Sequence, residues 1–160
     1  MHFVEESNRS CYPGWKAVGS TCLRFFVNTR RTWDGARAFC RRLGGDLALP
    51  KMSEPFSTTL TELLMLLTNA ETDLYVGFLR SRLRVGADKW VWNDGKTVDG
   101  QQFKRGYPMN GLKKSCGALS KDDMKLLNTD CSNMNGFICE SYQGALNNFQ
   151  RHLNHMKIEF

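Results

Sequence analysis

Six cysteines constrain the fold of this chain more than any other feature of its sequence. They are Cys11, Cys22, Cys40, Cys116, Cys131 and Cys139. An even number of cysteines in a chain of 160 residues is typical of a disulfide framework formed in an oxidising compartment. A zinc site would need closely spaced pairs, and here the nearest two cysteines have seven residues between them. The cysteines therefore predict disulfides and an extracellular protein, but their number alone leaves the pairing open.

Length and composition predict one globular domain with no membrane-spanning segment. Hydrophobic residues make up 41% and charged residues 24% of the sequence, as in ordinary globular proteins. The longest apolar run, residues 63–67, is far shorter than a membrane-spanning helix. The first residues do not resemble a signal peptide, so with the cysteines they favour a mature secreted protein or an ectodomain. Asn8, in the triplet Asn8-Arg9-Ser10, is a candidate N-glycosylation site.

Apolar spacing predicts two helices. Thr32 can cap the first, which ends before Gly44-Gly45. Its buried face would carry Trp33, Ala36, Cys40 and Leu43. The second is expected from residue 53 onward and carries a core-facing stripe of Leu60, Leu63, Leu64 and Leu67.

Runs of β-forming and apolar residues predict the strands. They occupy residues 21–27, 46–50, 74–78, 90–92, 116–119 and 136–139, and Cys11 and Cys22 bracket a hairpin. Residues 79–115 carry many glycines and little periodicity around the short strand 90–92. A long irregular stretch of this kind in a compact domain is usually functional.

Three segments follow one another in a specific order. They read Tyr75-Val76-Gly77-Phe78, then Trp90-Val91-Trp92-Asn93-Asp94-Gly95, then the block that runs from Cys131 through Gly136-Phe137-Ile138 to Cys139. Together with the cysteine hairpin and the inward Cys40, they resemble the C-type lectin-like domain. The resemblance covers residues 11–140 and uses all six cysteines.

The resemblance implies an α+β fold in which two helices flank two small, mostly antiparallel sheets, with a long loop region. It implies the pairs Cys11–Cys22, Cys40–Cys139 and Cys116–Cys131. The domain would then span residues 11–141, after an N-terminal extension, 1–10. The tail, 142–160, has helical apolar spacing and could pack on the domain, form a homodimer or lead into further domains.

Lectins of this family bind sugar through calcium, and the resemblance implies where that site would lie. Its ligands flank a cis proline in the long loop, precede the next cysteine and form a Trp-Asn-Asp run. Here Pro108, which the resemblance expects to be cis, lies between Tyr107 and Met109, and Lys113-Lys114 replace an acid. Only Asn128 and Asp130 remain as weak candidate ligands, with a local turn as the favoured alternative. The ligand count therefore predicts no cofactor and no tight calcium site.

The net charge of +6 is concentrated in clusters. Arginine forks suit sulfate, phosphate and carboxylate groups, so we interpret the basic ends of residues 79–115 as candidate ligand contacts; a solvated surface without a partner is the alternative. The candidates are Arg80, Arg82, Arg84, Lys104, Arg105, Tyr107, Met109, Lys113 and Lys114. A second basic cluster lies in and before the first helix, at Arg24, Arg30, Arg31, Arg37, Arg41 and Arg42.

Nothing in the sequence indicates an enzyme or a nucleic-acid-binding protein. Motifs for a serine nucleophile, a zinc protease or a phosphate loop are missing, and His152 and His155 lack a third metal ligand. Asp122-Asp123 is interpreted as an exposed turn. Aromatic residues are not interleaved with basic ones as in nucleic-acid recognition motifs.

We therefore expect an extracellular recognition module that binds a protein or an anionic glycan through residues 79–115 without calcium. One alternative is a carbohydrate-binding lectin with a degenerate calcium site at Asn128 and Asp130. The other is a structural or interaction domain of a larger extracellular or cell-surface protein.

Overall fold

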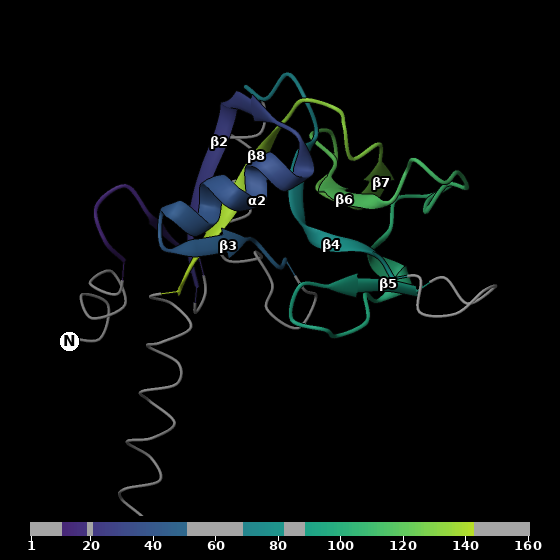
Figure 1. The fold of residues 1–160 in the computed structure, drawn as a ribbon, viewed down its shortest axis with the longest axis horizontal. Helices are drawn as coiled ribbons and strands as arrows, with labels where there is room; N and C mark the ends of the chain where they lie inside the picture. The colour runs from purple at the N-terminus through teal and green to yellow at the C-terminus, as the bar shows by residue number, and fades with distance from the viewer. Residues whose placement is uncertain (1–10, 19–20, 51–68, 82–88, 143–160) are drawn as a thin grey trace, which may run out of the picture.

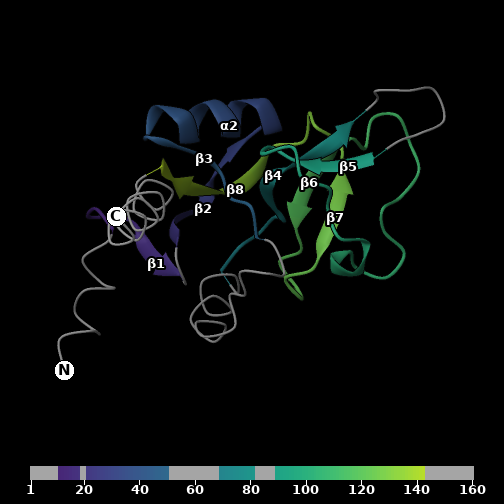
Figure 2. The ribbon, with the colours of Figure 1, turned by 90° about the horizontal axis from the view of Figure 1, so that it is seen from below.

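A computed structural model of the chain describes residues 11–18, 21–50, 69–81 and 89–142 (Figure 1). Its elements in chain order are β1 (Lys16–Val18), β2 (Thr21–Arg31), α2 (Trp33–Arg42), β3 (Gly45–Leu47), β4 (Leu74–Ser81), β5 (Lys89–Trp92), the 3-10 helix η2 (Gly100–Gln102), β6 (Cys116–Leu119), β7 (Leu126–Thr129) and β8 (Asn135–Ser141). Figure 2 shows α2 lying over β2, β3 and β8, while β5, β6 and β7 form the other half of the molecule. The fold is α+β, as expected.

The strands of the described residues form one hydrogen-bonded sheet rather than the two small sheets that we expected. Its order is β1-β2-β8-β4-β6-β7, with β3 also paired to β8 and β5 to β4. All pairs are antiparallel except β4 and β8, which run parallel through Leu74↔Gly136 and Tyr75↔Phe137. This pairing joins residues 62 positions apart in the chain, so no local pattern could have indicated it. Gly136 permits the contact, because a Cβ there would lie only 2.7 Å from the Leu74 side chain.

Helix α2 has the cap and the buried face that its sequence predicts. The Thr32 side chain accepts a hydrogen bond from the Gly35 N–H at 3.1 Å, which satisfies one of the free donors of the first turn. Trp33, Ala36 and Cys40 are buried, and the Trp33 indole donates to the Val76 carbonyl at 2.9 Å. The helix is therefore anchored directly to β4. Leu43, expected on this face, is instead exposed at the C-cap, because the helix ends there.

The three disulfides have the pairing that the resemblance implies. Cys11–Cys22 ties the N-terminal segment to β2, Cys40–Cys139 ties α2 to β8, and Cys116–Cys131 links β6 to the segment after β7. Cys40–Cys139 closes a segment of 99 residues. In the chain-entropy view, closing a loop of this length stabilises the folded state by up to about 4–5 kcal/mol.

Side chains alternate between two apolar clusters along the central strands. Leu74, Val76 and Phe78 of β4 enter one cluster, and Tyr75 enters the other, which includes Trp33 and Phe137. This alternation follows from the two-residue period of a strand. Both faces of β4 are therefore buried, and β4 is the centre of the core.

The expected strands are present with shifted ends, and one strand was missed. Residues 21–27 extend to Arg31, and residues 74–78 extend to Ser81. β1 pairs antiparallel with β2 and so confirms the hairpin that Cys11 and Cys22 were expected to bracket. β7 was not expected, because it is very short and contains Asn128, a residue type that favours turns. The second helix, Asn8 and most of the tail lie outside the described residues. Within the described ranges, no helix is long and apolar enough to cross a membrane.

Gly45 provides a test of the β3·β8 pairing. A Cβ at residue 45 would overlap the Glu140 carbonyl oxygen, a backbone atom that cannot move without opening the pair. We expect Gly45→Ala to lower the free energy of unfolding by about 1–3 kcal/mol, measured by urea denaturation. Gly100→Ala is the control, because nothing lies within 4 Å of the added methyl. Equal stability of the two variants would contradict this account.

Candidate functional site

The long loop, residues 93–115, leaves β5 and returns to β6 with a fixed base. Phe103 is buried, with its ring centroid 5.6 Å from that of Phe78 and 6.0 Å from that of Trp90. The Lys104 N–H donates to the Leu126 carbonyl at 2.8 Å, which attaches the loop to β7. The side-chain amide of Gln102 donates to the Pro50 carbonyl at 2.8 Å. The base of the loop is thus built into the core.

Asn128 connects β7 to the far part of the long loop. Its side-chain oxygen accepts a hydrogen bond from the Met109 N–H at 2.7 Å. Its amide nitrogen donates to the carbonyls of Met109 and Lys114, each at 2.8 Å. The residue is only 2% exposed, so these bonds are shielded from water. A side-chain amide has four hydrogen-bonding sites, and Asn128 uses three of them on the loop backbone.

The segment that Asn128 holds follows directly on a bend in the loop. The Tyr107–Pro108 peptide bond is cis, as the resemblance implied. Met109 comes next and is hydrogen-bonded to Asn128 through both its N–H and its carbonyl. The bend is therefore fixed by a protein amide. The sequence interpretation of Asn128 as a turn residue was wrong, because its side chain bonds residues 14 and 19 positions away.

Asp130 lies in a turn, as expected, and its carboxylate is bonded locally. One carboxylate oxygen accepts from the Ser132 hydroxyl at 2.7 Å and from the Ser132 N–H at 2.9 Å. These bonds, helped by the charge of Lys113, hold the pKa of the Asp130 carboxyl below its usual range. The buried Tyr75 hydroxyl lies 2.9 Å from the Asp130 carbonyl and 2.7 Å from that of Asn133. Burial, together with the nearby Asp130 charge, raises the pKa of Tyr75, so the hydroxyl stays protonated and serves as a donor to this turn.

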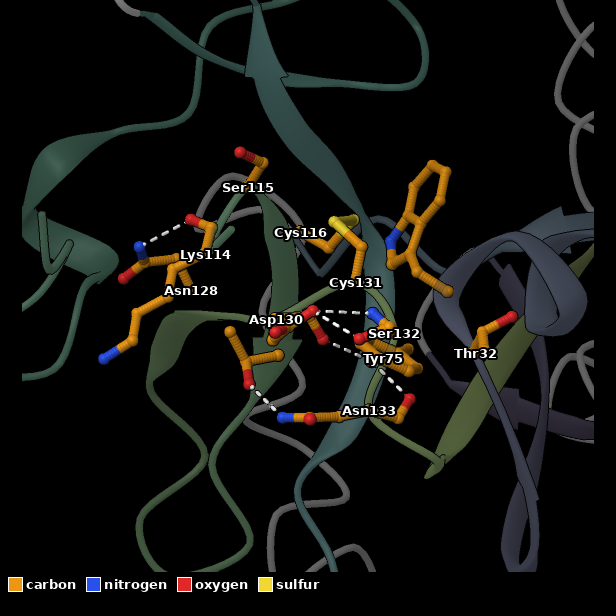
Figure 3. Close-up of a disulfide and its surroundings, with 12 residues drawn as sticks. Thr32, Tyr75, Lys114, Ser115, Cys116, Asn128, Asp130, Cys131, Ser132 and Asn133 are labelled. Atoms are coloured by element: carbon orange, nitrogen blue, oxygen red, sulfur yellow. Dashed lines mark hydrogen bonds between the residues drawn. A yellow bond between two sulfur atoms is a disulfide. The ribbon is translucent and has the colours of Figure 1, made fainter. Parts of the chain in front are cut away.

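The two candidate calcium ligands therefore bond different partners. Figure 3 shows the Asn128 amide directed toward Lys114 and the Asp130 carboxylate directed toward Ser132. Lys114, in the segment where the family would carry an acid, places its ammonium 3.8 Å from the Met109 sulfur, beside the bend. Among the residues that the structure describes, no three His, Cys, Asp or Glu side chains gather in a way that could hold a metal ion.

The basic candidates are not equivalent. Lys104 lies 3.7 Å from Asp123 and 4.0 Å from Asp122, so its charge is compensated by the exposed turn that these two residues form, as predicted. Arg80 packs its guanidinium over the Trp90 ring at 5.0 Å. Arg105 and Lys113 are exposed on the long loop. Arg82 and Arg84 lie outside the described residues.

The apolar candidates divide in the same way. Tyr107 is half-buried and packs against both core clusters. Met109 is 42% exposed. Leu112, which sequence reasoning missed, is 76% exposed close to Lys113. The feature of the sequence that could have indicated Leu112 is an isolated apolar residue in a basic, glycine-rich segment. The long-loop face, defined here as Arg105, Met109, Leu112 and Lys113, thus combines apolar and cationic groups.

Comparisons with known proteins agree on one domain type. A family model described as "Lectin C-type domain" matches residues 29–141. Ladderlectin of Oncorhynchus mykiss is 30% identical over 133 residues, which cover 80% of this chain and 66% of that protein. Rheacalcin-2 of Rhea americana is 26% identical over 153 residues, covering 84% and 98% respectively. The structure of a calcium-independent type II antifreeze protein superposes with a TM-score of 0.62 at 26% identity, covering 82% of this chain and 93% of that one.

Asn128 supplies a direct test of the loop attachment. Asn128→Ala leaves the Met109 and Lys114 backbone groups without their partner, so we expect a loss of about 1–3 kcal/mol in unfolding free energy. The Met109 amide should also lose protection from hydrogen exchange. Asn128→Asp should be no better, because it keeps the acceptor but places negative charge against two carbonyls.

The matched control is Asp130→Ala, which removes a hydrogen-bond acceptor from the same β7–β8 region, because the Asp130 carboxylate accepts hydrogen bonds from Ser132 and not from the loop backbone that Asn128 holds. We expect it to leave the hydrogen exchange of Met109 unchanged. Equal loss of protection in the Asp130 and Asn128 variants would contradict a specific role for Asn128.

Proposed function

The chain belongs to the C-type lectin domain family, and from that premise we propose that it is an extracellular recognition module that binds its ligand through the long-loop face without calcium. The ligand is a protein or an anionic glycan. The proposal is one of binding and not of catalysis. The disulfides support an extracellular location, because such bonds form and persist in oxidising compartments.

The observation that carries the proposal is the engagement of Asn128. In a calcium-dependent lectin, side-chain oxygens of this region would face the ion. Here the Asn128 oxygen accepts the Met109 N–H, and its nitrogen donates to two loop carbonyls. Calcium prefers roughly six to eight oxygen ligands. The Asp130 carboxylate, which is already hydrogen-bonded to Ser132, falls far short of that number. We infer that the Asn128 side-chain amide holds the long loop in place, as the calcium ion does in calcium-dependent lectins.

The chemistry of the long-loop face supports the class of ligand. Met109 and Leu112 offer exposed apolar surface, and Arg105 and Lys113 add positive charge around it. Methionine and arginine are enriched at protein interfaces, and cations at the rim steer acidic partners. A neutral monosaccharide would make little use of this combination. A similar solved structure is named as calcium-independent, which fits the same reading.

Calcium titration tests the absence of a working metal site. A site with a Kd of about 1 mM, typical of the weakest extracellular modules, would stabilise the fold by about 1.4 kcal/mol at about 10 mM calcium. We expect no shift of the melting temperature beyond that produced by matched magnesium, and no heat of binding in calorimetry. A calcium-specific rise in melting temperature that EDTA reverses would overturn the proposal and favour a degenerate calcium-dependent lectin.

A binding screen with variants tests the location of the site. The probe is an array of sulfated, sialylated and neutral glycans together with a library of cell-surface proteins, applied in EDTA. We expect Met109→Ala/Lys113→Ala to weaken the signals retained in EDTA by about tenfold, because it removes an apolar contact and a steering charge. Lys96→Ala, at an exposed cation in the turn after β5, is the control and should retain them. Equal binding by the two variants would place the ligand elsewhere.

A further inference from the structure

The arginines of β2, α2 and the residues between them divide into two sets. Arg37 and Arg41 share Asp46, with nitrogen–oxygen distances of 3.1 and 3.7 Å. Arg30 forms an ion pair with Glu71. These three cations are compensated by carboxylates. The other three, Arg24, Arg31 and Arg42, have no carboxylate within ion-pair distance among the described residues.

The three uncompensated arginines gather over two neighbouring aromatic rings. The Arg24 guanidinium carbon lies 5.1 Å from the centre of the Phe26 ring. Those of Arg31 and Arg42 lie 5.7 and 5.9 Å from the centre of the Phe39 ring. The Phe26 and Phe39 centroids are themselves only 5.0 Å apart. The three side chains thus form one cluster, called here the arginine–phenylalanine cluster.

The rings beneath this cluster are held by the core. Phe26 stacks on Phe137 of β8 at 5.0 Å, and Phe39 meets Phe137 edge-on at 5.3 Å. Phe26 comes from β2 and Phe39 from α2, so the platform is shared by a strand and a helix. Because each guanidinium rests on a fixed ring, little side-chain freedom is lost when an anion binds.

The charges of the cluster favour an anionic ligand. An aromatic face attracts a guanidinium group without neutralising its positive charge. Asp34, the carboxylate of the first turn of α2, forms no ion pair with any described residue.

We propose that Arg24, Arg31 and Arg42 form a second binding site, on the α2–β2 face, for the sulfate groups of a sulfated polysaccharide. Planar guanidinium forks match the oxygens of sulfate. A chain with repeated sulfates can contact guanidinium groups that lie over two different rings. In the sheet order, β2 is separated from β6 and β7 by β8 and β4, so this face is distinct from the long-loop face.

Binding of the full chain to heparin, the sulfated probe, tests the site by calorimetry and by salt elution from a column. We expect Arg24→Ala/Arg31→Ala/Arg42→Ala to weaken binding about tenfold or more and to reduce its dependence on salt. Arg24→Lys/Arg31→Lys/Arg42→Lys, which keeps the charges but loses the forks, should bind with intermediate affinity. Unchanged melting temperatures would show that the variants are folded; if the triple variant is unstable, the single Arg24→Gln and Arg31→Gln variants replace it.

The matched control is Lys89→Ala/Lys96→Ala/Lys125→Ala, which removes the same charge from exposed residues outside the cluster. It should bind heparin nearly as the unchanged chain does. Equal weakening by both triple variants would reduce the effect to net charge and overturn the proposal. The proposal would also be overturned if Met109→Ala/Lys113→Ala lost heparin binding while the arginine variant kept it. That result would assign heparin to the long-loop face alone.

The same titrations with other polyanions identify the class of ligand. Desulfated heparin and hyaluronan, which offer carboxylates only, should bind much more weakly than heparin. Polyglutamate and vesicles with about one-third phosphatidylserine represent acidic proteins and anionic membranes. Tighter binding of either probe than of heparin would overturn the choice of a sulfated polysaccharide.

Discussion

The two parallel residue pairs between β4 and β8 hold the molecule together. On the β8 side lie β2, β3 and α2, and on the β4 side lie β5, β6 and β7. The pairing requires Gly136, because a Cβ there would collide with the Phe26 carbonyl oxygen and with the Leu74 side chain. It also places Tyr75 and Phe137 in one apolar cluster with Trp33 of α2. One short contact therefore makes two antiparallel units into a single sheet with a shared core.

The candidate site depends on that contact through Tyr75. Its hydroxyl reaches the carbonyls of Asp130 and Asn133 and so fixes the turn between β7 and β8. The Cys116–Cys131 disulfide holds the same turn to the start of β6, where the long loop ends. Asn128 pairs with Gly117 in this frame, and its side chain crosses to the loop. The loop is thus held by a protein amide and a disulfide.

Local features were predictable from the sequence, and long-range ones were not. The Thr32 cap and the buried face of α2 depend only on nearby residues, so spacing alone indicated them. The disulfide pairing came from the resemblance to a family. The role of Asn128 was missed because its partners lie 14 and 19 residues away, and an asparagine before Thr129-Asp130 also fits a turn. Lys104 was predicted as a candidate ligand contact, and the sequence did not indicate that folding places it beside Asp122 and Asp123.

The same limit applies to charge. The sequence shows six arginines in and before the first helix but cannot tell which of them have carboxylate partners. The fold separates them, because Asp46 on β3 reaches Arg37 and Arg41 while Arg24, Arg31 and Arg42 rest on phenylalanine rings. The cluster and the long-loop face belong to opposite halves of the sheet and share no residue. Energetic effects of substitutions in distant sites without common partners are usually additive. The two faces should therefore bind independently, so that substitutions in one face add to substitutions in the other in their effect on binding free energy. A ligand that contacts both faces would make these effects depart from additivity.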